Sequence, residues 1–344
     1  MAREHFEYML TPDGGRIRYR FWPSTCAVAP KAPVKTVLLM QGRASFMEKF
    51  SKIIETLQGK GYHVWSFDWR GQGLSSRMTK NRHKGHIDSY ETYLQDLRQL
   101  LHLIILPHVH GPFYILGQSM GSHLAMRFLA ESPGIFDGAF LTAPMLELNT
   151  GGYTPSLAQK IVNAGCKLGL GTSFVPGHGS YNPAKEPFEG NLLTHDRKSF
   201  LTHRELQKKN PDLSVGGVTF GWVKATLASM ETLNHPEVLA RIEVPVFAIL
   251  AGDEGVVDNT NAQTILSWLP EGGFKIYEGA RHQLLSESVC YMRRFWEDFD
   301  AFMERCSKKN ALPKGRLVES PQLARVQRIY PTLPNDFQGR QTHP

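Results

Sequence analysis

The feature that most constrains the fold of this 344-residue chain is a series of short stretches that are apolar without interruption. Such runs are typical of parallel strands buried on both faces of a sheet. Segments with the apolar spacing of helices separate them. This alternation predicts an α/β fold with a mostly parallel sheet and helices on both faces. The apolar runs are 36–40, 62–67, 113–116, 139–141 and 244–250, and the helical segments are 46–57, 90–106, 120–130, 262–268 and 289–303.

The alternation is absent at the start of the chain, in one internal stretch and at the end. Alternating segments flank the turn residues 11–15 and predict an antiparallel hairpin. The internal stretch is rich in Gly and Pro and has one amphipathic segment, 157–168, preceded by Thr154 and Pro155 as N-cap and first turn. We therefore expect four parts. They are a core in two pieces (1–145 and 236–307), an inserted helical cap (146–235) and a basic, proline-containing tail (308–344).

The strongest chemical signal is Gly117-Gln118-Ser119-Met120-Gly121, which lies directly between an apolar run and a helical segment. In that position the pentapeptide predicts a nucleophile elbow, where small residues allow a tight strand-to-helix turn that exposes the Ser119 hydroxyl. The N-terminus of the following helix adds partial positive charge near the reacting oxygen. A plain glycine-rich turn is the alternative, and the order of strand, motif and helix favours the nucleophile.

A serine hydroxyl needs a base within hydrogen-bond reach, and the base needs a carboxylate that orients it. His282 follows the last expected strand, 274–277, while Asp253 and Asp258 follow the strand at 244–250. This order of Ser, Asp and His is that of the α/β hydrolases. We expect Asp253 to orient His282 and Asp258 to support the site or cap the helix from Ala262. An ordinary surface histidine is the alternative for His282.

The oxyanion of a tetrahedral intermediate needs two N–H donors, which we assign to the backbone of Arg43 and Met120. Gly42 lets the loop after the strand at 36–40 turn back toward the nucleophile. Two roles stay open for the Arg43 side chain. In the first, the guanidinium binds a phosphate or carboxylate of the substrate. In the second, the side chain faces solvent or pairs with Glu48.

The net charge of +7 lies mainly in the predicted tail, which holds seven basic and two acidic residues. Residues 1–307 hold 32 basic and 30 acidic residues, so a nucleic-acid partner is not expected. For the tail, weak contact with an anionic membrane and a solvated segment both stay open. The polar start and the lack of a long apolar stretch predict a cytoplasmic protein, peripheral on the inner membrane face if the tail binds lipid.

Several motifs together resemble the serine α/β-hydrolases of the monoglyceride lipase group. Within that group the chain is most similar to the bacterial lysophospholipases of the L-two type, and the resemblance runs through nearly all of residues 36–295. The motifs shared with the group lie at 68–75, 117–121, 141–145 and 276–282, and those shared with the L-two type lie at 41–43, 84–86, 191–195, 215–219 and 256–259.

The resemblance implies an α/β-hydrolase fold and hydrolysis of the carboxylic ester of a monoacyl lipid, either a lysophospholipid or a monoacylglycerol. Ser119 would attack, His282 would carry the proton, Asp253 would orient His282, and water would hydrolyse the acyl-enzyme. No metal and no cofactor are expected. Two alternatives stay open: a serine esterase, thioesterase or acyltransferase acting on small non-lipid substrates, and a non-catalytic binding protein that keeps the fold.

Overall fold

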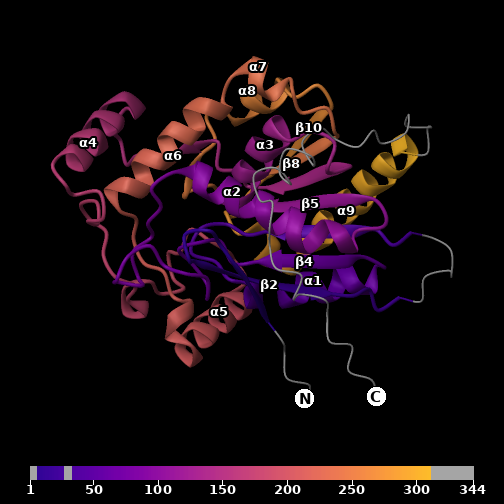
Figure 1. Ribbon diagram of the computed structural model, residues 1–344, viewed down its shortest axis with the longest axis horizontal. Helices are drawn as coiled ribbons and strands as arrows, with labels where there is room; N and C mark the ends of the chain where they lie inside the picture. Colours follow the sequence, from indigo (N-terminus) through magenta and orange to yellow (C-terminus); the bar gives the residue numbers. More distant parts are fainter. Residues whose placement is uncertain (1–5, 27–32, 311–344) are drawn as a thin grey trace.

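An eight-stranded sheet forms the centre of the computed structural model, which describes residues 6–26 and 33–310 (Figure 1). The strand order is β1-β2-β4-β3-β5-β6-β8-β10. β2 pairs antiparallel with β1 and β4, and the remaining neighbours are parallel, as the sequence predicts. The strands are β1 (Glu7–Leu10), β2 (Arg16–Trp22), β3 (Thr36–Met40), β4 (His63–Phe67), β5 (Phe113–Gln118), β6 (Gly138–Thr142), β8 (Val246–Ala251) and β10 (Gly272–Tyr277), with β7 (Glu147–Leu148) and β9 (Val257–Asp258) as a separate pair.

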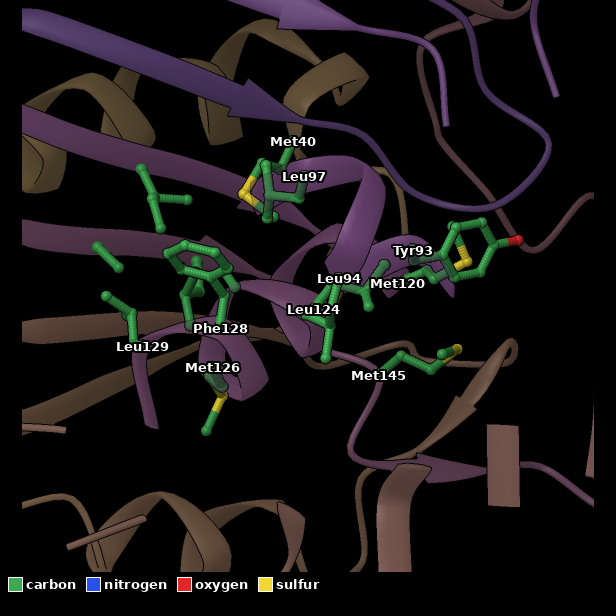
Figure 2. Close-up of a cluster of buried hydrophobic side chains, with 14 of the residues drawn as sticks. Met40, Tyr93, Leu94, Leu97, Met120, Leu124, Met126, Phe128, Leu129 and Met145 are labelled. Carbon is green, nitrogen blue, oxygen red and sulfur yellow. The ribbon is translucent and has the colours of Figure 1, made fainter. Parts of the chain in front are cut away.

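Helices cover both faces of the sheet because alternate strand residues point to opposite sides. In β3, Leu38 and Met40 join an apolar cluster with α2 and α3, while Val37 and Leu39 join a second cluster with α1 and α9. Figure 2 shows part of the first cluster, with Met40 near Leu97 of α2. The helices are α1 (Ser51–Gly59), α2 (Tyr90–Leu100), α3 (Met120–Glu131), α4 (Pro155–Lys167), α5 (Arg197–Lys209), α6 (Phe220–Leu233), α7 (Pro236–Leu239), α8 (Ala262–Ser267) and α9 (Val289–Asn310).

The stretch between β6 and β8 contains α4, α5 and α6, which occupy the left side of the view in Figure 1. The predicted helix is confirmed as α4. Its N-cap is Thr154, whose side chain accepts a hydrogen bond from the Leu157 N–H, and Pro155 is in its first turn. α5 and α6 were not predicted. The boundaries assigned to a cap, 146–235, stay a prediction.

The last described helix, α9, runs from Val289 to Asn310, so it is longer than the predicted segment 289–303. It includes Lys308 and Lys309, the first two residues assigned to the tail. The rest of the predicted tail, 311–344, lies outside the described residues. Within the part of the chain that the structure describes, no helix has both the length and the apolar character needed to cross a membrane.

Candidate active site

Ser119 lies in a sharp turn between the end of β5 and the start of α3, as the sequence predicts. Its φ of +54° belongs to the left-handed region, which is uncommon for a residue with a side chain. The Ser119 N–H donates to the Thr142 carbonyl at 2.9 Å and stabilises this backbone. Gly121 allows the turn to pack against the end of β3, because a Cβ there would lie 2.2 Å from the Met40 carbonyl oxygen.

His282 faces this serine from the loop after β10. Its Nε2 lies 2.9 Å from the Ser119 Oγ, and the imidazole is buried. Two contacts hold the loop. The Gln283 N–H donates to the Leu193 carbonyl at 2.7 Å, and the Arg281 N–H donates to the Glu287 carboxylate at 3.0 Å. The histidine and the serine are 163 residues apart in the sequence, so the fold itself brings them together.

The carboxylate that contacts His282 is Glu254. Its two oxygens lie 2.8 and 3.0 Å from the His282 Nδ1, and both side chains are almost fully buried. A carboxylate at Nδ1 accepts a hydrogen bond from the N–H of that nitrogen and favours the tautomer in which Nε2 is free to accept the Ser119 hydroxyl proton. The Val256 N–H donates to the same carboxylate at 2.8 Å, which fixes its orientation.

The prediction that Asp253 orients His282 is therefore wrong. The Asp253 side chain is 60% exposed and pairs with Arg281 at 3.3 Å. The Asp253 N–H donates to the Ala280 carbonyl in the turn after β8. In this turn the Asp253 side chain points outward and the Glu254 side chain points inward, toward His282. Asp258 is also away from His282, in β9, where its carboxylate accepts a hydrogen bond from the Thr260 N–H at 2.8 Å.

Gly42 brings the loop after β3 against the nucleophile. A Cβ at this position would lie 3.1 Å from the Ser119 Cβ and 3.3 Å from the Gln118 carbonyl oxygen. The backbone of Arg43 follows directly. On the other side of Ser119, Met120 is the first residue of α3, where backbone N–H groups have no partner within the helix. Its side chain is buried beside Tyr93 and Leu124 (Figure 2).

The side chain of Arg43 does not pair with Glu48, whose carboxylate binds Arg18 instead. The Arg43 Nη1 donates to the Gly216 carbonyl at 2.9 Å, and the guanidinium lies over the Trp222 ring. Burial lowers the pKa of this guanidinium from its usual value. Within residues 6–26 and 33–310, no carboxylate forms an ion pair with this guanidinium; Glu186, which pairs with Arg204, attracts it only from a longer distance.

Three residues that the sequence analysis did not select contribute to this geometry. Glu254 is adjacent to the predicted Asp253. Either aspartate or glutamate can orient the base of such a site, so the sequence after the strand at 244–250 did not distinguish the two residues. Glu287 is buried and accepts a hydrogen bond from the Arg281 N–H in the histidine loop. Gln72 contacts the loop that contains Gly42, and its position in the glycine-rich motif 68–75 was the available signal.

Comparisons with known proteins show the family of this chain. The family model described as serine aminopeptidase, S33, matches residues 31–289. Lysophospholipase L2 of Escherichia coli is 30% identical over 265 residues, which cover 74% of this chain and 75% of that protein. Probable lysophospholipase L2 of Haemophilus influenzae is 29% identical over 277 residues, covering 80% and 86%. Human monoglyceride lipase is 23% identical over 286 residues, covering 81% and 84%.

Solved structures share the architecture. A soluble variant of monoglyceride lipase from Saccharomyces cerevisiae, in complex with a substrate analog, has a TM-score of 0.67 at 18% identity and covers 88% of this chain and 96% of its own. Monoacylglycerol lipase from Paleococcus ferrophilus has a TM-score of 0.63 at 16% identity, with coverage of 84% and 98%. At these identities the likeness establishes the α/β-hydrolase fold.

Proposed function

The chain belongs to the family described as serine aminopeptidase, S33, and from this premise we propose that it is a serine hydrolase that cleaves the carboxylic ester of monoacyl lipids. The observation that carries the proposal is the continuous hydrogen-bonded series Ser119, His282 and Glu254. The ester specificity follows the curated relatives, which are lysophospholipases and monoglyceride lipases by name.

In the proposed reaction, His282 Nε2 takes the Ser119 proton as the Oγ attacks the ester carbonyl carbon. The imidazolium formed is stabilised by Glu254 at 2.8 Å, then gives its proton to the leaving alcohol as the carbon–oxygen bond breaks. Water attacks the acyl-enzyme by the same route, which releases the fatty acid and restores Ser119. The backbone N–H groups of Arg43 and Met120 stabilise the oxyanion, since both flank Ser119.

The test of this function is turnover by the purified protein. The panel contains lysophosphatidylcholine, lysophosphatidylethanolamine, monoolein and short p-nitrophenyl esters, and Ser119→Ala is the control that removes the nucleophile. We expect hydrolysis of the lipids by the native protein and loss of activity in the variant. A strong preference for the short esters would favour the alternative, an esterase, thioesterase or acyltransferase acting on small substrates. Activity retained by Ser119→Ala would exclude the mechanism.

For the Arg43 side chain, the structure favours binding of an anionic head group. A half-buried guanidinium without a carboxylate partner is costly, and a phosphate would provide charge-assisted hydrogen bonds in its place. The backbone of Arg43 directly follows Gly42, which packs against Ser119, and this supports a role for Arg43 near the reacting ester. Arg43 thus selects lysophospholipids over uncharged monoacylglycerols.

The measurement for Arg43 is the ratio of kcat/KM for lysophosphatidylcholine to that for monoolein. Arg43→Met should lower this ratio by about 10-fold or more, because a hydrogen bond to a charged group contributes roughly 1.5–3 kcal/mol. Arg197→Met is the matched control, since Arg197 is an exposed arginine that pairs with Glu189. An unchanged ratio in Arg43→Met would rule out this role.

A monoacyl lipid resides in or near a membrane, and we propose that the protein binds an anionic bilayer peripherally. Exposed apolar side chains on α4 and on the loops beside it support this. We call them the α4 apolar surface, which consists of Tyr153, Leu157, Ile161, Leu168 and Leu170. From 148 to 185 the chain has no acidic residue, while Lys160, Lys167 and Lys185 are basic. The predicted basic tail would add a second contact.

A further inference from the structure

We propose that Gln72 is a positioning residue that fixes the Arg43 backbone N–H in the orientation that an oxyanion requires. The inference rests on the proposed function. Gln72 is buried, in the glycine-rich turn after β4, and does not contact Ser119 or His282 through any described hydrogen bond. Its carboxamide contacts the backbone on both sides of Arg43.

The two contacts are reciprocal. Gln72 Nε2 donates to the Gly42 carbonyl at 2.7 Å, and Gln72 Oε1 accepts from the Ala44 N–H at 3.1 Å. The Gly42 carbonyl and the Arg43 N–H belong to one planar peptide unit, so holding the carbonyl fixes the direction of the N–H. A hydrogen bond accepted at the carbonyl also polarises the N–H of the same unit and strengthens it as a donor.

The local backbone needs this restraint. Ala44 has a φ of +54°, in the left-handed region that costs about 1 kcal/mol or more for a residue with a side chain. Gln72 is the neighbour that binds the Ala44 N–H. Without the carboxamide, the peptide units on both sides of Arg43 would be free to rotate, and the donor would lose its direction.

The turn that carries Gln72 is itself rigid. The Trp69 indole N–H donates to the Gln41 carbonyl at 2.8 Å, and the buried Asp68 carboxylate accepts from the Met47 N–H at 3.0 Å. Gly73 is required beside Asp68, because a Cβ there would lie 2.1 Å from that carboxylate. The loop that contains Arg43 is therefore attached to the 68–75 turn at several points, and Gln72 supplies the contact at the donor itself.

The test uses kcat per active site, counted by a fluorophosphonate titration, with p-nitrophenyl butyrate as substrate. Gln72→Met has similar length and no hydrogen-bonding group. It should lower kcat by about 10- to 100-fold with KM within about twofold, somewhat less than removal of an oxyanion donor. An alkyl boronic acid, which forms a tetrahedral adduct with a serine, should lose affinity in the same proportion.

Gln72→Glu adds a signature that a purely structural role would not give. An ionised carboxylate accepts the Ala44 N–H but cannot donate to the Gly42 carbonyl, whereas a protonated carboxyl can do both. The ratio of the variant kcat to the native kcat should therefore rise as the pH falls. Ser75→Ala is the matched control, because Ser75 hydrogen-bonds within the same turn, to the Asp68 carbonyl, and should keep its kcat.

A native kcat in Gln72→Met together with a pH-independent ratio in Gln72→Glu would overturn the role of Gln72 and leave the proposed function intact. A native protein that hydrolyses no carboxylic ester would contradict the proposed function as well. Loss of kcat in Gln72→Met with unchanged boronate affinity would also overturn the proposal, because the oxyanion site would then be intact.

Discussion

Glu254 and Asp253 are adjacent in the chain, but their carboxylates have different surroundings. Glu254 is almost fully buried against the His282 imidazole, while Asp253 is 60% exposed beside Arg281. A buried hydrogen bond to an imidazolium is strong, and an exposed pair with arginine contributes little. The contact between Ser119 and His282 could be predicted from the places of both residues beside strands. The acid could not, because the direction of each side chain depends on the turn after β8.

Substitution of these two carboxylates separates their roles. Glu254→Gln should lower kcat by roughly 10³-fold or more, since an amide there no longer stabilises the imidazolium or ensures the right tautomer. Asp253→Asn should change kcat by less than about threefold. The measurement is steady-state hydrolysis of p-nitrophenyl butyrate, with Asp258→Asn as a further carboxylate control. A large loss in Asp253→Asn with a near-native Glu254→Gln would restore the original assignment.

Among the helices, α4 could be predicted and α5 and α6 could not, for a physical reason. α4 has one apolar stripe and a clear N-cap, Thr154. The buried residues of α6 do recur at helical spacing, but two of them, Thr226 and Ser229, are polar. Apolar residues such as Val223 and Leu227 lie outside the buried set, so the sequence gives no clear amphipathic period. α5 is largely polar and gives a weak apolar signal. Apolar periodicity therefore identifies a helix only where the apolar residues coincide with its buried face.

The contact between α3 and the loop after β3 depends on Gly121. Gly121→Ala would place a Cβ 2.2 Å from the Met40 carbonyl oxygen, so the two backbones must separate. Overpacking of this kind costs about 1–3 kcal/mol, despite the better helix propensity of alanine. We expect a lower free energy of unfolding in urea and a lower kcat. Gly59→Ala in α1 is the control, because a Cβ there meets nothing within 4 Å. Equal stability of the two variants would contradict this packing argument.

α3 also carries a buried histidine that makes stability depend on pH. His123 is fully buried, and burial lowers its pKa from 6.5 to about 3. Below pH 6.5 the unfolded chain binds a proton at this residue and the folded chain does not, so stability falls as the pH decreases. At pH 5 the loss from this group is about 2 kcal/mol.

The variant His123→Gln keeps a polar group near Ser229, to which His123 Nε2 is hydrogen-bonded at 2.7 Å. Its free energy of unfolding should fall less between pH 7.5 and pH 5 than that of the native protein, by the same 2 kcal/mol or so. Urea denaturation at the two pH values measures this difference. Parallel pH profiles for both proteins would mean that His123 takes up its proton in the folded state.

The sheet could be predicted almost entirely, because the buried parallel strands are continuous apolar runs. The strand pair β7 and β9 could not, since each has two residues. The candidate site forms where the loops after β3, β5, β8 and β10 meet, and those strands precede and follow the stretch between β6 and β8. The α4 apolar surface is a separate feature of the stretch between β6 and β8, so lipid binding and ester hydrolysis can be tested separately.

Membrane binding is the last prediction. The double variant Leu157→Asn and Ile161→Asn should reduce co-sedimentation with phosphatidylglycerol-containing vesicles by roughly 10-fold, since each exposed side chain would bury apolar area in the lipid. Val289→Asn is the control, because Val289 is an exposed apolar residue on α9.

A chain that ends at Asn310 tests the tail. Its binding should be weaker than that of the full chain, mainly at low salt, where electrostatic attraction is least screened. Equal binding by all four proteins would refute both contacts, and hydrolysis of water-soluble esters should be the same in all of them.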